Sequence, residues 1–184
     1  MTKQQLFEIR MHYLWKSICS MMGTFAKALP LAILIGIITK YVINYVKKNR
    51  QTVIHKYKER AIVIFAVYIV IMVQMTILFR DIGSGYIIDV VPFNTPGGTN
   101  QIILYAFANM VAFLPLGILC PVIWNRMNDW KKMLFIGFFG SLLIEIAQLI
   151  LQCGEFQIED LLMNSVGTVI GYIIYSKWNK KRKI

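Results

Sequence analysis

A stripe of small and polar residues interrupts the apolar run 133–152. Gly137, Ser141, Glu145, Gln148 and Gln152 recur there at helical spacing. At 100° per residue they fall within about 80° of one helix face. A carboxyl group in such a helix is expensive to bury, so Glu145 is a candidate general base or ligand-binding group.

A second polar stripe lies in the apolar run 161–175 and the residues just before it. Asp160, Asn164, Gly167 and Gly171 share an arc of about 60°. Asp160 is a second candidate general base, although a residue at a helix start serves equally well as an N-cap. Gly167 and Gly171 have the spacing of a close helix contact, and they are a candidate interface for a homo-oligomer.

A third apolar run, 102–124, contributes Asn109, six residues before Pro115. If adjacent runs cross a bilayer in opposite directions, Asn109 lies about 10 Å below the same edge as Glu145. Arg80 is the nearest cation at that level. The sequence therefore predicts an outward-facing polar pocket whose ligand-binding residues are Asn109, Glu145, Gln148, Asp160, Asn164 and Arg80. The alternative for the amide side chains, including Gln74, is hydrogen bonding between helices.

Familiar catalytic groups are missing from this set. The two histidines, His12 and His55, lie in flanking segments, and the three cysteines share no metal-ligand spacing. There is no HExxH motif and no Ser–His or Cys–His pair near the pocket. We therefore expect no metal and no cofactor, and a binding role in preference to catalysis, with Glu145 and Asp160 as the groups that catalysis would use.

The elements that position these residues must be membrane helices. Hydrophobic residues make up 57% of the 184 residues, more than a small soluble domain can bury. Apolar runs at 28–46, 61–79, 102–124, 133–152 and 161–175 predict an all-α membrane helix bundle with about five transmembrane helices. The last run covers only about 22 Å, so it crosses the bilayer only if Glu159 and Asp160 begin the helix or the bilayer thins locally.

The charge pattern predicts the orientation. The net charge is +11, and the basic residues gather between runs one and two, between runs three and four, and in the C-terminal tail. The positive-inside rule predicts that these segments are cytoplasmic, in a multi-pass membrane protein. No base-reading motif accompanies the charge, so we expect membrane lipids and not nucleic acid as partners.

The N-terminal segment fits this rule poorly, because five spans place it outside despite its four basic residues. We expect residues 6–22 to form an amphipathic helix in the outer interface; the alternative is that this segment dips into the membrane. Residues 1–60 then hold the interfacial helix, the first span and a basic cytoplasmic loop, and residues 61–184 form the membrane domain. The outer segment 83–100 is rich in glycine and proline, so we expect no helix there.

Four sequence elements in order resemble the VanZ-like family. They are Val91-Pro92-Phe93, the run from Asn109 to Gly117, the run from Ser141 to Gln148 and the run from Ile158 to Gly167. The resemblance covers about residues 80–175 and implies a small bacterial membrane protein whose namesake confers teicoplanin resistance. Gly154 and Gln157 stand where family members commonly carry Arg and Asp, and Asp89 stands where Asn is common.

We therefore expect a role in glycopeptide resistance or envelope homeostasis. In this interpretation the outer pocket engages a glycopeptide or a lipid-linked envelope precursor. One alternative is a membrane-embedded enzyme that acts on a lipid headgroup. Another is a transporter or partner subunit, for which 184 residues are few unless the protein assembles into an oligomer.

Overall fold

A computed structural model describes residues 3–83, 85–89 and 99–182 of the chain. The described residues form five α-helices, one π-helical turn, one 3₁₀ turn and two short strands. In chain order these are α1 (Lys3–Arg50), α2 (Lys56–Val73), the π turn η1 (Gln74–Leu78), β1 (Gly85–Asp89), α3 (Thr99–Ile123), the 3₁₀ turn η2 (Asn125–Met127), α4 (Trp130–Leu151), β2 (Cys153–Gln157) and α5 (Ile158–Arg182).

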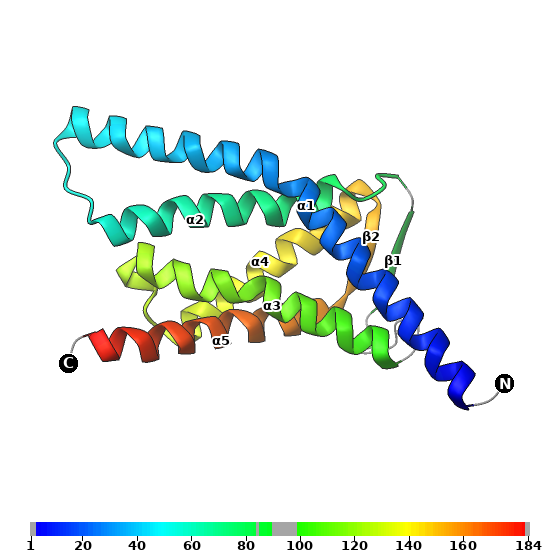
Figure 1. The fold of residues 1–184 in the computed structure, drawn as a ribbon. Helices are drawn as coiled ribbons and strands as arrows, with labels where there is room; N and C mark the ends of the chain where they lie inside the picture. The colour runs from blue at the N-terminus through cyan, green and yellow to red at the C-terminus, as the bar shows by residue number, and fades with distance from the viewer. Residues whose placement is uncertain (1–2, 84, 90–98, 183–184) are drawn as a thin grey trace.

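The helices lie roughly along one axis (Figure 1). Helices α1, α3 and α5 run in one direction, and α2 and α4 run in the other. The C-terminus, the loop between α1 and α2, and the connection between α3 and α4 share one end of the bundle, which we call the tail end. The two strands lie at the opposite end, which we call the sheet end.

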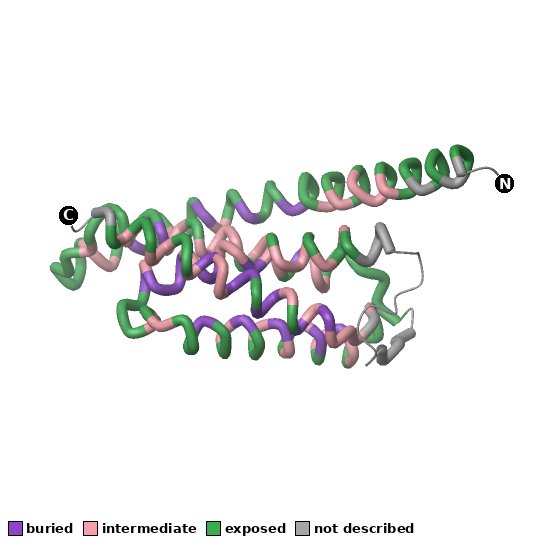
Figure 2. Tube along the Cα trace, turned by 90° about the horizontal axis from the view of Figure 1, so that it is seen from below, coloured by how far each residue is buried: buried purple, intermediate pink, exposed green. Residues whose placement is uncertain are grey.

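The surface of the bundle is apolar, as lipid contact requires. Large side chains such as Ile37, Leu143 and Ile150 are more than 60% exposed, and buried residues lie mainly where helices pack on one another (Figure 2). Within the described residues, four helical stretches are long and apolar enough to cross a membrane: Phe7–Arg50, Lys56–Leu78, Ile103–Ile123 and Trp130–Leu151. The prediction of an all-α membrane bundle is confirmed.

Helix α5 is less apolar than the other four, yet it extends along α3 from the sheet end to the tail end (Figure 1). It begins at Ile158, so Glu159 and Asp160 lie in its first turn, as its length requires. Its 25 residues extend for about 37 Å, which exceeds the usual thickness of the hydrocarbon layer.

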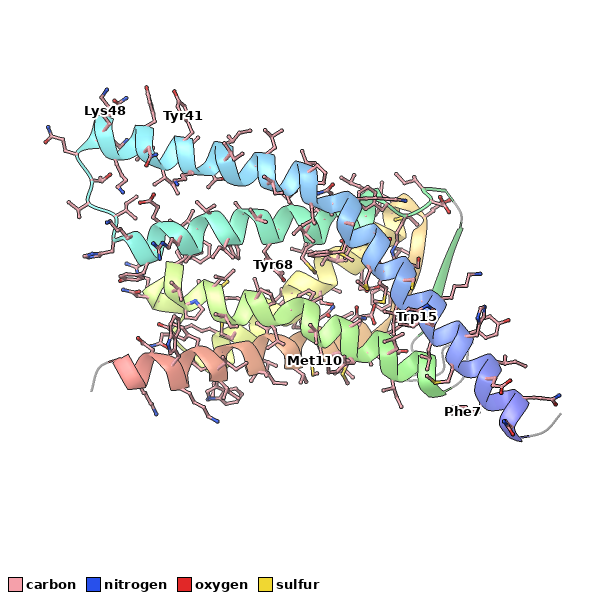
Figure 3. All side chains as sticks on the ribbon, viewed as in Figure 1. Phe7, Trp15, Tyr41, Lys48, Tyr68 and Met110 are labelled. Atoms are coloured by element: carbon pink, nitrogen blue, oxygen red, sulfur yellow. The ribbon has the colours of Figure 1, made fainter. Side chains whose placement is uncertain are left out.

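The N-terminal segment is not a separate interfacial helix. Residues 3–50 form one helix of 48 residues that continues through Pro30. Its length of about 72 Å is more than twice the hydrocarbon thickness. Its first turns, with Phe7, extend past the rest of the bundle at the sheet end (Figure 3), whereas Trp15 lines a groove with Ile103 and Phe107 of α3.

The tightest packing in the bundle joins α3 to α5. A Cβ atom added at Gly167 would overlap the backbone oxygen of Met110, and one added at Gly171 would overlap that of Leu114. Both glycines therefore serve a contact within the chain. The homo-oligomer interface expected at these glycines stays a prediction.

Two short strands were not predicted. Strands β1 and β2 pair in parallel, from Gly85 opposite Cys153 to Asp89 opposite Gln157. The absence of a helix is borne out for the described residues 83 and 85–89, whereas α3 already begins at Thr99. The Val91-Pro92-Phe93 element lies outside the described residues. The pairing brings the segment after α2 against the turn between α4 and α5. Helices α4 and α5 are the two that carry the polar stripes.

Candidate functional site

The predicted stripe on α4 is the buried face of that helix. Gly137, Ser141, Glu145 and Gln148 are all buried, and the side chain of Glu145 is only 2% exposed. Gln152 departs from the stripe, because it is exposed and ends the helix with a left-handed backbone, φ 50°.

Glu145 meets a side chain of α5 directly and is linked to α3 through that side chain. A hydrogen-bonding interaction links the carboxyl groups of Glu145 and Asp160, on α4 and α5. The amide nitrogen Nδ2 of Asn109, on α3, donates a short hydrogen bond to Oδ1 of Asp160. Asn109 and Asp160 are half-buried, so they connect the covered Glu145 with the surface of the bundle.

One helical turn deeper, a second polar pair joins α4 to α5. Nδ2 of Asn164 donates to Oγ of Ser141 at 2.8 Å, and both residues are buried. The other amide atom of Asn164, Oδ1, is buried and accepts no hydrogen bond from the described residues. A buried acceptor without a donor costs about 1 to 3 kcal/mol, so this oxygen is a place where a ligand or water gains a hydrogen bond.

About one turn beyond Glu145 toward the sheet end, Gln148 links α4 to the π turn η1, which follows α2. Nε2 of Gln148 donates to the backbone oxygen of Thr76 at 2.9 Å. A π turn shifts the regular hydrogen-bond ladder, and such turns are frequent at functional sites. Oε1 of Gln148 and Nη1 of Arg80 both lie within 3.1 Å of the point where a Cβ atom of Gly154 would sit. Gln148 and the exposed Arg80 are therefore neighbours above Gly154.

Strand β2 covers the carboxyl pair from the sheet end. The backbone nitrogen of Gln157 donates to Oε2 of Glu145 at 3.4 Å. Arg80 interacts electrostatically with both Glu145 and Asp160, so the structure brings this cation near the carboxyl pair. All six predicted residues lie at the sheet end of the bundle. We call Arg80, Asn109, Glu145, Gln148, Asp160 and Asn164 the polar cluster.

Gln74 lies apart from the polar cluster. Its side chain is buried, and Nε2 donates to the backbone oxygens of Ala28 at 3.1 Å and Val70 at 3.4 Å. Gln74 therefore ties α2 to α1, which is the structural alternative considered for the amide side chains.

The sequence did not predict three parts of the chain that contact the polar cluster. They are the backbone oxygen of Thr76, the backbone nitrogen of Gln157 and the backbone of Gly154, which carries no side chain. The first two act through main-chain atoms, which every residue carries, so residue type gave no signal. Gly154 offered one, because a glycine in the short turn between two helices with polar stripes leaves room for a neighbouring side chain.

The polar cluster offers two carboxyl groups, one cation and several amides, a set suited to binding hydroxyl, amide or anionic groups. Among the described residues, no three His, Cys, Asp or Glu side chains converge in a way that could hold a metal ion.

Comparison with known proteins shows the family to which the chain belongs. Residues 65–179 match the VanZ/LLP1 family, and this stretch includes more than half of the chain and the whole polar cluster. The chain belongs to the VanZ/LLP1 family. It is 30% identical over 93 residues to Protein VanZ of Enterococcus faecium, which covers 50% of this chain and 55% of that protein. The chain thus matches only about half the length of this curated relative. No solved structure matches the chain.

One difference from the family pattern, at Gly154, can now be compared with the structure. This VanZ/LLP1 protein has Gly154 where a resemblance to the family predicted an arginine. The guanidinium group of Arg80 lies directly against Gly154. A cation therefore occupies this part of the site, although it comes from the end of α2 and not from the turn between α4 and α5.

Proposed function

We propose that this VanZ/LLP1 protein holds an envelope component or lipid-linked ligand at the polar cluster and thereby lowers the action of a glycopeptide such as teicoplanin. The bound molecule presents hydroxyl, amide or anionic groups to Asn109, Asp160 and Arg80, which reach the surface of the bundle. Glu145 and Asn164 form the covered floor of the site.

One observation supports this proposal above the others: two carboxyl groups meet inside a membrane bundle, an amide group donates to one of them, and a guanidinium group interacts electrostatically with both. Hydrogen bonds between amide side chains would hold helices together at far lower cost than buried carboxyl groups. An expensive arrangement of this kind is typical of a functional site.

The charge pattern supports an outward-facing polar cluster. The basic loop after α1, the connection between α3 and α4, and the C-terminal tail all lie at the tail end (Figure 1). By the positive-inside rule this pattern favours a cytoplasmic tail end, and it supports a polar cluster that faces the outer leaflet of the bacterial cytoplasmic membrane. Glycopeptides and lipid-linked envelope precursors meet at that leaflet.

Susceptibility of a bacterial host to teicoplanin tests the proposal. Glu145→Gln keeps the size of the side chain and an acceptor for the backbone of Gln157, but it removes the carboxyl group. We expect about a tenfold loss of protection, because hydrogen bonds to charged groups contribute about 1.5 to 3 kcal/mol. Asp129→Asn is the matched control, since Asp129 caps α4 at its other end and Asn caps equally well.

The comparison needs equal amounts of folded protein in the membrane, which immunoblotting of membrane fractions measures. Protection that survives Glu145→Gln unchanged would refute the proposal. An equal loss with Asp129→Asn would show that protection depends on the bundle as a whole and would also count against it.

The paired carboxyl groups favour a second candidate function, an enzyme that acts on a lipid headgroup. Two carboxyl groups in contact can divide the roles of general acid and general base. Incubation of purified protein with a labelled envelope lipid distinguishes the two functions. A product that forms with the natural protein, but not with Glu145→Gln, supports catalysis; binding of the labelled lipid without any product supports the first proposal.

A further inference from the structure

A basic groove lies between α1 and α2 at the tail end, far from the polar cluster. Its volume is about 560 Å³. Four cations line it, Lys40 and Lys47 from α1 and Lys56 and Arg60 from α2, together with a single carboxylate, Glu59. The groove lies outside residues 65–179, so the family match assigns it no role.

The charge of this groove is poorly compensated. Nζ of Lys47 and Oε2 of Glu59 form an ion pair at 2.6 Å, which occupies the carboxylate. Lys40, Lys56 and Arg60 form no ion pair within the part of the chain that the structure describes. Glu59 also interacts electrostatically with Lys40 and Lys56, so a single carboxylate faces all of these cations. The excess of cations over carboxylates is repulsive, and an anion placed between them reduces that repulsion.

The position of Lys40 argues for a lipid over a soluble anion. This lysine lies ten residues before the end of α1, about 15 Å from the helix end, within an otherwise apolar run. The groove continues along the apolar side chains of Val63 and Ile64 on α2. A ligand that fits has an anionic head for the cations and a hydrocarbon chain for the apolar part.

We infer that this groove binds an anionic phospholipid of the leaflet that faces the tail end. The phosphate of the headgroup contacts Lys40, Lys56 and Arg60, and one acyl chain follows Val63 and Ile64. The bound lipid fills the space between α1 and α2 and fixes α1 against the family domain. This inference is independent of the function proposed for the polar cluster.

Lipid binding to the purified full-length protein tests the inference. The protein in detergent is mixed with phosphatidylglycerol or with phosphatidylcholine, and native mass spectrometry counts the retained lipids. The variant Lys40→Gln/Arg60→Gln removes two groove cations. The control Lys48→Gln/Arg126→Gln removes the same residue types at the tail end, outside the groove; Lys48 points away from the bundle (Figure 3).

We expect the groove variant to weaken retention of phosphatidylglycerol by about thirtyfold, since each basic residue near an anionic headgroup contributes about fivefold. The control should change it less than about twofold, because its cations lie outside the groove. Equal losses in both variants, or equal retention of phosphatidylcholine by the natural protein, would overturn the inference. Displacement of the lipid by an equal concentration of glycerol phosphate would also overturn it, because the groove would then be a site for soluble anions.

Discussion

The substitution Gly167→Ala adds one methyl group at the closest approach of α3 and α5. In an isolated helix this change is favourable by about 1 kcal/mol, because alanine is the better helix former. Here the new Cβ atom would overlap the backbone oxygen of Met110. A backbone atom in a helix cannot rotate away as a side chain does, so the two helices must move apart.

The expected loss in unfolding free energy follows from this overlap. Overpacking usually destabilises by about 1 to 3 kcal/mol, and a clash with backbone lies at the upper end of that range. For a chain of this size, a loss of about 3 kcal/mol lowers Tm by about 6 to 12 °C. Separation of α3 from α5 also draws Asn109, the neighbour of Met110, away from Asp160. We therefore expect Gly167→Ala to reduce protection against teicoplanin as well.

Thermal unfolding in detergent, followed by the fluorescence of the four tryptophans, measures the effect. Two matched controls carry the same substitution. A Cβ atom at Gly23 would have no neighbour within 4 Å, and one at Gly140 would lie 3.8 Å from Cε1 of Phe113, an ordinary contact. Both controls should leave Tm unchanged or raise it. If Gly167→Ala behaves like these two, the close packing of α3 on α5 is refuted.

Three further predictions concern individual contacts. In a double-mutant cycle, Asn109→Ala and Asp160→Ala should show a coupling of about 1.5 to 3 kcal/mol in unfolding free energy, and additive effects would contradict their hydrogen bond. Gln74→Leu should cost about 1 kcal/mol or less in thermal unfolding and leave teicoplanin susceptibility unchanged; a loss of protection would extend the site to Gln74. Gly154→Ala should lower protection with little change in Tm, because the new methyl group displaces the guanidinium group of Arg80; unchanged protection would exclude Arg80 from binding.

Helix periodicity predicted the parts of the site that lie on regular helices. The stripe through Ser141, Glu145 and Gln148 needed only 100° per residue, and Asn109 and Asp160 needed only the alternating direction of successive spans. These two rules place side chains at a common depth and on facing sides. The hydrogen bond between Asn109 and Asp160 is the outcome.

The ends of the helices could not be predicted in the same way. The predicted break before residue 28 is absent, because residues 20–28 contain no strong breaker: Gly23 is a single glycine, and the hydroxyl of Thr24 bonds to the backbone of Ser20 within the helix. The pairing of β1 with β2 joins residues almost seventy positions apart. A strand of five residues has little recognisable sequence pattern, and the fold of the bundle determines which strand it pairs with.

The irregular backbone at the sheet end explains why carboxyl and amide groups gather there. In a membrane, non-helical backbone is tolerated only where protein or a water-filled space satisfies its hydrogen bonds. The polar cluster does so directly, since Gln148 bonds to the π turn at Thr76 and Glu145 accepts from the strand at Gln157. These contacts need an acceptor or donor of the right shape but no net charge. An amide in place of Glu145 would meet the structural need, so the retained carboxyl group points to a demand that the fold alone does not make.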